Sequence, residues 1–155
     1  MGMVMFYHMT RSDAAHTVRS LVGRAMAQDW RVMIRGTDHA KLEQLDAKLW
    51  LGPEEEFLPH GLQGGAQESD QPVLIGQGPV TNGARALALL DGAQATDVEI
   101  AAMERVWILF DGADDARLQA ARVDWKRLSS AGIAAQYWSE DSGRWEKKAE
   151  SGAAS

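Results

Sequence analysis

The sequence predicts an α/β fold with three layers, α/β/α, around a mainly parallel sheet. Short runs rich in β-branched and aromatic residues alternate with longer stretches whose apolar residues recur every three or four positions. Two of the runs, "RALALLDG" and "RVWILFDG", are apolar almost throughout, as strands buried on both faces are. Helices that join parallel strands cover both faces of a sheet, so the three layers follow from the alternation.

The first half of the chain contains two strand–helix units. Val4 to His8, "VMFYH", is expected to be a strand, and Ser12 is a candidate N-cap for the helix that follows. "WRVMIR" from Trp30 predicts a second strand, after which Thr37 or Asp38 can cap a second helix. The apolar residues expected to face the core are Ala15, Val18, Leu21, Val22, Ala25 and Met26 in the first helix and Leu42, Leu45 and Leu49 in the second.

The second half repeats the alternation after a loop rich in Gly, Gln and Pro. Further strands are expected at "PVLIG", "RALALLDG", "RVWILFDG" and "IAAQYW". Thr96 and Glu99 have the spacing of a capping box at the start of a short helix. A long helix is expected over residues 114–131, with Gly132 ending it.

The length of 155 residues and the 45% apolar composition favour a single domain with its own core, over residues 1–145. Residues 146–155 end in small polar residues, "SGAAS", and are expected to be a flexible tail.

Composition limits the function. The absence of cysteine excludes disulfides, thiolate metal sites and cysteine nucleophiles. A formal net charge of -6 argues against broad binding to DNA phosphates. No apolar run approaches the roughly 20 residues of a membrane span, and the first residues lack the pattern of a signal peptide. The expected location is therefore the cytoplasm, without membrane contact.

Motifs for nucleotides are weak. Gly76, Gly78 and Gly83 follow a strand, but Pro79 removes a backbone donor and the next element is another strand. We interpret them as a turn, with a cofactor role as the less favoured alternative. The result is a Rossmann-like fold without a phosphate loop, and no cofactor is expected.

Metal and catalytic motifs are equally weak. Asp111, Asp114 and Asp115 could hold Mg²⁺, but carboxylates at that point are also typical helix caps. "PEEEF" could be an acidic docking strip or an ordinary solvated charge run. The four histidines lack metal-ligand spacing, and no Ser, Thr or Lys has the context of an activated nucleophile. No metal or catalytic residue is predicted.

The long helix combines an apolar stripe with positive charge. The stripe is Leu118, Ala121, Trp125 and Leu128. Arg122 and Lys126 flank Trp125 at neighbouring positions of the helix, which also carries Arg117 and Arg127. Trp125 can be a residue at the core edge beside solvated cations. It can also belong to an apolar pocket with a positive rim, suited to an acidic peptide with an aromatic end.

Segments spread over nearly the whole chain, in order, resemble the chi subunit family of bacterial DNA polymerase III. They are "FYHMT", "RVMIR", "LDAKLWLGPEEEFLPHGL", "PVLIG", "RVWILFDG", "ARVDWKRLSSAG" and "YW". Among them the signature "LDxxLW…FLPH" is specific. The resemblance implies an accessory protein of DNA replication without catalytic activity of its own. Such proteins bind the acidic, Phe-terminated C-terminal tail of single-stranded-DNA-binding protein and connect it through the psi subunit to the clamp loader, so contact with DNA is indirect.

Carried over by position, the tail-binding residues implied by the resemblance are Trp50, Phe57, Arg122, Trp125 and Lys126. The two cations would pair with the acidic residues and terminal carboxylate of the tail, and the aromatics would enclose its apolar end. Trp50 and Phe57 form one wall of this pocket if their loop folds against the long helix. They can also simply attach the loop to the rest of the domain.

Two departures from enteric members of the family concern this site: Leu118 stands where they have Lys, and Trp125 where they have Tyr. Arg117 is a candidate to rebuild the positive rim. No residues are assigned to the surface that would bind the psi subunit. A small α/β nucleotide-binding protein or enzyme that lacks the usual motifs is the alternative function.

Overall fold

The computed structural model describes residues 3–10, 14–50, 60–64, 68–140 and 142–151, with Trp50 described in its backbone only. In chain order the elements are β1 (Met3–Met9), α1 (Ala14–Ala27), β2 (Val32–Arg35), α2 (His39–Trp50), β3 (Gly61–Leu62), the 3₁₀ turn η2 (Glu68–Asp70), β4 (Val73–Gly76), β5 (Ala86–Leu90), α3 (Asp97–Ala102), β6 (Arg105–Asp111), α4 (Asp115–Ser130), β7 (Ala135–Ser139) and β8 (Glu146–Ser151).

The strands form one sheet in the order β3-β4-β2-β5-β6-β1-β7-β8. Every neighbouring pair is parallel except β7 and β8, which are antiparallel. The mainly parallel α/β fold expected from the sequence is confirmed. All residues of β2, β4 and β5 are buried, which is why their sequences show no alternation of apolar and polar residues.

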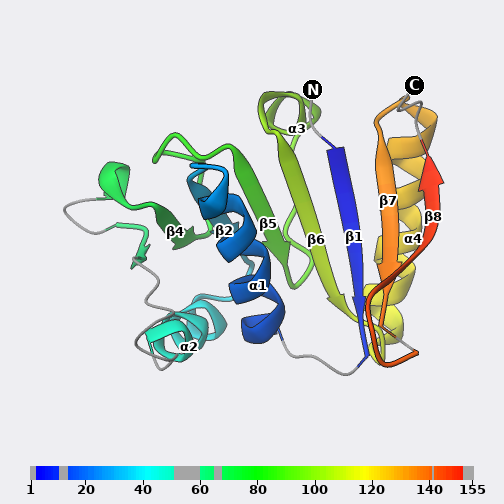
Figure 1. The fold of residues 1–155 in the computed structure, drawn as a ribbon, viewed down its shortest axis with the longest axis horizontal. Helices are drawn as coiled ribbons and strands as arrows, with labels where there is room; N and C mark the ends of the chain where they lie inside the picture. The colour runs from blue at the N-terminus through cyan, green and yellow to red at the C-terminus, as the bar shows by residue number, and fades with distance from the viewer. Residues whose placement is uncertain (1–2, 11–13, 51–59, 65–67, 141, 152–155) are drawn as a thin grey trace.

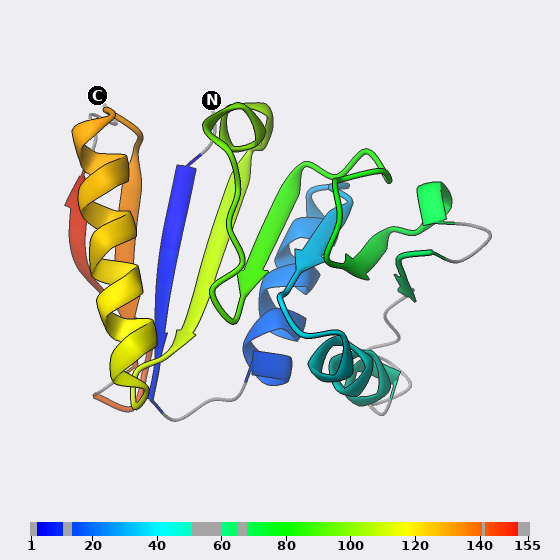
Figure 2. The ribbon, with the colours of Figure 1, turned by 180° about the vertical axis from the view of Figure 1, so that it is seen from behind.

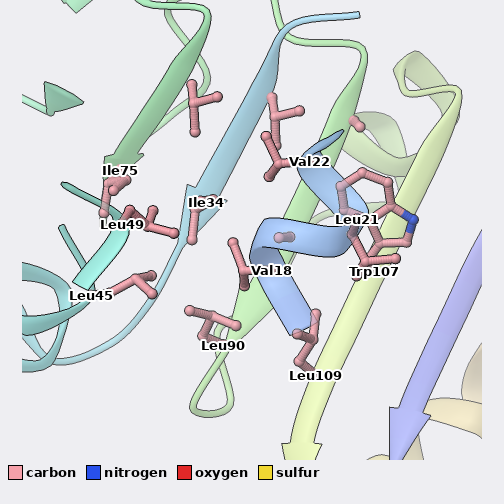
Figure 3. Packing of buried hydrophobic residues seen from close by; sticks show 14 of the residues in the cluster. Val18, Leu21, Val22, Ile34, Leu45, Leu49, Ile75, Leu90, Trp107 and Leu109 are labelled. Atoms are coloured by element: carbon pink, nitrogen blue, oxygen red, sulfur yellow. The ribbon is translucent and has the colours of Figure 1, made fainter. Parts of the chain in front are cut away.

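Helices cover the two faces of the sheet differently. The apolar residues of α1 and α2 share a buried cluster with one face, and those of α3 and α4 share a second cluster with the other. Figure 3 shows Val18, Leu21 and Val22 of α1 among the buried side chains that the strands project toward this helix. In Figure 1, α1 and α2 lie on the side of β4, β2 and β5. Figure 2 shows the molecule from the back, and there α4 lies in front of β7 and next to β1.

Local signals in the sequence position the helix ends. The Asp38 carboxylate accepts a hydrogen bond from the Ala40 N–H at 2.9 Å and caps α2, one of the two caps expected. Thr96 and Glu99 make both hydrogen bonds of the predicted capping box. The Ser12 cap lies outside the described residues.

The C-terminal segment differs from the flexible tail expected from residue 146. Residues 146–151 form β8, which pairs with β7 through a bulge at Tyr137 and Trp138. The sequence of this strand, "EKKAES", is mostly charged, and charged side chains are normal on an edge strand, where they oppose further pairing. Residues 152–155 lie outside the described residues.

The glycines at the end of β4 lie in a turn that the chain itself fills. A Cβ on Gly76 or Gly78 would lie within 3.0 Å of the Gln63 side chain. The Gln63 amide accepts a hydrogen bond from the Gly78 N–H at 2.8 Å and donates one to the Pro79 carbonyl at 2.9 Å. These glycines therefore allow close approach of Gln63.

No helix in the described part of the chain is both long enough and apolar enough to cross a membrane.

Candidate functional site: the surface of helix α4

Helix α4 is fixed at both ends. The Asp114 carboxylate accepts hydrogen bonds from the N–H groups of Ala116 and Arg117, as expected of a cap. At the other end Gly132 has φ +77°, and hydrogen bonds from its own N–H and from that of Ile133 to carbonyls of the last turn close a Schellman motif. The side chains of α4 are therefore presented on a rigid support.

Trp125 lies at the boundary between the core and solvent. Its ring is half-buried and makes edge contacts with Phe6 and Tyr137, with ring centroids 5.6 Å and 6.0 Å away. The Tyr137 hydroxyl is hydrogen bonded to the Nδ1 atom of His8 at 3.0 Å. Aromatic contacts of this geometry fix the orientation of the ring. Trp125 is thus the core-edge residue expected from the stripe, with part of its surface open to solvent.

Arg122 and Lys126 are exposed next to Trp125. Within the described residues neither of them makes an ion pair or a hydrogen bond. By contrast Arg127 of the same helix is paired with Asp97 of α3, at 2.9 Å. The arrangement leaves two cations available to an anionic partner at this surface.

Arg117 does not join the other two cations. Its guanidinium lies against Gly92, where an added Cβ would be 2.2 Å from the Nη1 atom. It also lines a separate pocket at the ends of β5 and β6. Leu118 packs against the buried cluster under α4. The positive rim on the outer side of α4 therefore consists of Arg122 and Lys126.

The structure does not bring all five predicted site residues together. Trp50 is the last residue of α2, whose leucines belong to the cluster on the opposite face of the sheet from α4. Helix α2 contacts β3 and β4, and α4 contacts β6 and β7, so the two helices are also at different ends of the sheet. Phe57 lies outside the described residues. Arg122, Trp125 and Lys126 form one surface, and the end of α2 belongs to another.

A second candidate site lies at the carboxyl ends of the central strands. A pocket of about 420 Å³ opens where β1 leads to α1 on one face and β6 leads to α4 on the other. This is the position at which α/β sheets commonly bind ligands. Lys41 and Arg117 line it together with three carboxylates, Asp91, Asp111 and Asp114. Negative charge at this density opposes a phosphate, and Asp114 already occupies the N-terminus of α4.

Metal ligands do not gather in the part of the chain that the structure describes: no group of three or more His, Asp or Glu residues there could hold an ion. Asp111 and Asp114 instead accept hydrogen bonds from backbone N–H groups of the turn and of α4.

A comparison with family models matches residues 1–136 to "DNA polymerase III chi subunit, HolC". The chain belongs to the DNA polymerase III chi subunit family. A relative, DNA polymerase III subunit chi from Escherichia coli K12, is 36% identical over 70 residues, which are 43% of this chain and 48% of the relative. The alignment thus spans about half the length of that protein.

The matching family model is named for a subunit of DNA polymerase III. The family match ends within β7, so Trp138, Trp145 and β8 lie beyond it. Sequence reasoning assigned no role to Tyr137, which forms the floor under Trp125 together with Phe6. The "QYW" run predicted a strand, but its periodicity could not tell which helix would pack on it.

Proposed function

We propose that this chi-family protein is a non-catalytic adaptor of the replisome. Its α4 surface binds the acidic, Phe-terminated tail of single-stranded-DNA-binding protein, and another surface, through the psi subunit, links it to the clamp loader. The observation that carries the proposal is the pair of exposed cations without partners in the described residues, Arg122 and Lys126, beside the half-buried ring of Trp125. Charge-assisted hydrogen bonds to carboxylates and an apolar ring are what such a tail requires.

The proposal limits the tail surface to α4. Trp50 was expected to form a wall of the same pocket, but it ends a helix in the other layer. An extended tail that contacts Arg122 cannot reach through the sheet to the end of α2. A Trp50→Ala variant tests this division: it should leave tail affinity unchanged, and a clear loss would restore the single five-residue pocket.

The test is titration of a fluorescently labelled tail peptide into the protein and its variants. Arg122→Ala should weaken binding about tenfold, because one charge-assisted hydrogen bond is removed. Trp125→Phe keeps the packing on Phe6 and Tyr137 but removes part of the apolar surface, so a smaller loss is expected. Arg127→Ala is the matched control on the same helix, because that cation is already paired with Asp97. Equal losses in the Arg127 and Arg122 variants would contradict a local site.

Salt gives an independent check. The cations are exposed, so their attraction to the tail should weaken as the screening length falls from about 8 Å at physiological salt to about 3 Å near 1 M. The salt dependence should be smaller in Arg122→Ala than in the unsubstituted protein. A tail affinity that does not change with salt would remove Arg122 and Lys126 from the proposal.

The alternative function is nucleotide binding, and the pocket beyond β1 and β6 is the observation that favours it. Any ligand selective for the folded state raises the melting temperature. We expect no increase with ATP, GTP or a dinucleotide. A saturable increase that Lys41→Ala abolishes would establish the alternative.

A further inference from the structure

In the part of the chain that the structure describes, one half of the sheet has no helix on one face. The strands β6, β1 and β7 carry α4 on one side, as Figure 2 shows, but α1 and α2 lie over the other half of the opposite side, as Figure 1 shows. In the described residues this uncovered face is filled by large side chains instead of a helix. Three-layer folds normally bury both faces of a parallel sheet. Trp30, Trp138 and Trp145 on this side keep part of their surface open to solvent, and apolar surface that stays open to solvent marks binding sites.

Two adjoining pockets of about 320 and 410 Å³ form a groove along this face, between α1 and the strands. They share Met5, Tyr7 and Leu21 in their walls. Four of the six tryptophans of the chain line the groove: Trp30, Trp107, Trp138 and Trp145. Trp107 is buried, and the other three rings are partly open to solvent. Each pocket has a volume within the range of about 300–1,000 Å³ that is usual for ligand sites.

The groove carries positive charge without negative charge. Arg24 and Arg105 line it, and no Asp or Glu is among its described lining residues, although the chain has a formal charge of -6. Arg24 is exposed and has no ion pair in the described part of the chain, and the Arg105 guanidinium lies 5.8 Å from the centroid of the Trp30 ring. Burial raises the pKa of Tyr7 to about 12, and the positive charges of Arg24 and Arg105 oppose that shift.

We propose that this groove binds a short acidic peptide segment of a partner protein, anchored by an aromatic or aliphatic side chain between the tryptophan rings. The tryptophan rings supply the apolar contact for the anchoring side chain, and Arg24 and Arg105 supply partners for carboxylates of the peptide. The site is separated by the sheet from the α4 surface, so it does not depend on the proposed function of α4.

Two other occupants fit the observations less well. Single-stranded nucleic acid also stacks on aromatic rings, but it needs a row of cations along its phosphates, and the groove has two arginines. A second copy of the chain would place the same patch against itself, which brings Arg24 and Arg105 of one copy toward those of the other. Of the three occupants, an acidic peptide is the one that matches both the positive charge and the apolar surface of the groove.

The experiment uses fluorescein-labelled random copolymer of Glu and Tyr, an acidic polypeptide with aromatic anchors, and measures its binding by fluorescence anisotropy. The full chain with Arg122→Ala is used, so that binding at α4 does not obscure the groove. In this background Arg24→Gln should weaken binding about tenfold. Lys48→Gln is the matched control, because Lys48 is an exposed cation on α2 away from the groove. Polyglutamate, which lacks anchors, should bind more weakly than the copolymer.

The indole N–H signals in nitrogen–proton NMR spectra locate the binding. The copolymer should shift the signals of Trp30, Trp138 and Trp145 and leave that of Trp125 in place. Equal affinities in the Arg24→Gln and Lys48→Gln proteins, or shifts confined to Trp125, would overturn the proposal. Oligo(dT) that binds more tightly than the copolymer, with the same dependence on Arg24, would assign the groove to nucleic acid instead. If the tail peptide of the proposed function fails to bind at α4, the binding of the copolymer in the groove is still measured independently.

Discussion

Arg35 is a buried cation whose charge is neutralised within the fold. It lies at the end of β2, and its guanidinium makes two hydrogen bonds to the Glu99 carboxylate, at 2.6 Å and 3.1 Å, and others to the carbonyls of Gly78 and Gln94. The hydrogen bond from Arg35 is the main reason that the pKa of Glu99 falls from its ordinary value of 4.5 to about 2. A buried charge is strongly destabilising when its partner is removed, so this pair holds α3 to the sheet.

The Glu99→Gln substitution should therefore destabilise the protein. Gln keeps the capping-box hydrogen bond to the Thr96 N–H but removes the negative charge facing Arg35. We expect a loss of about 2 kcal/mol in the free energy of unfolding, measured by urea denaturation. Glu104→Gln is the control, because its pair with Arg85 is exposed to solvent and its loss should destabilise the protein much less. Equal effects of the two substitutions would contradict a special role for the buried pair.

The same pair predicts a pH dependence. Because the folded-state pKa of Glu99 is lowered, its contribution is fully present above about pH 4.5 and is lost as the pH falls toward about 2. The stability difference between the unsubstituted protein and Glu99→Gln should thus shrink across this interval. Thermal unfolding of both proteins at several pH values measures it, and a constant difference down to about pH 2 would argue against the lowered pKa.

At the scale of elements, α4 depends on its first turn. The Asp114 carboxylate satisfies two backbone N–H groups that otherwise have no partner within the helix. The helix then carries Trp125, Arg122 and Lys126 in one fixed register, on a stripe completed by Ala121 and Leu128. The cap and the tail surface are therefore physically linked.

Asp114→Ala should reduce the free energy of unfolding by about 1 kcal/mol, the usual cost of losing an N-cap. Asp114→Asn should retain most of the stability, because the amide oxygen can accept the same hydrogen bonds. Asp115→Ala, at the exposed position next to it, should cost less than Asp114→Ala. Urea denaturation of the three variants gives the comparison, and a larger loss for Asp115→Ala would mean that the cap is elsewhere.

At the scale of the whole molecule, β8 decides how the sheet ends. It pairs antiparallel with β7, and the Gln136 side chain donates a hydrogen bond to Glu150 across the pair at 2.8 Å. Without β8 the edge of β7 would be unpaired beside the apolar groove, next to Trp138. Unpaired edges next to apolar surface favour association between chains.

Ending the chain after Trp145 should therefore lower the melting temperature by several degrees and produce concentration-dependent association, detected by light scattering. Ending it after Ser151 removes only residues 152–155 and should change neither property. A protein ending at Trp145 that is as stable and as monodisperse as the control would show that β8 adds little to the sheet.

Local sequence determined most elements and their ends. The buried strands, the Asp38 and Asp114 caps, the capping box of Thr96 and Glu99, and Gly132 after α4 all depend on neighbouring residues, so a pattern of a few positions predicts them. The strand β8 was not predicted, because an exposed edge strand and a solvated tail have similar compositions. The two-residue strand β3 was missed because so short a run has no periodicity.

Placement across the sheet was decided by tertiary structure alone. The sequence predicted that Arg122, Trp125 and Lys126 share one helix face, because helical spacing is a local property. It could not determine that α2 with Trp50 would pack on the opposite face, or that Trp30, Trp107 and Trp138 would line one groove with Trp145. Strand order and the side on which each connection crosses place these distant residues, and both depend on contacts between segments far apart in the chain.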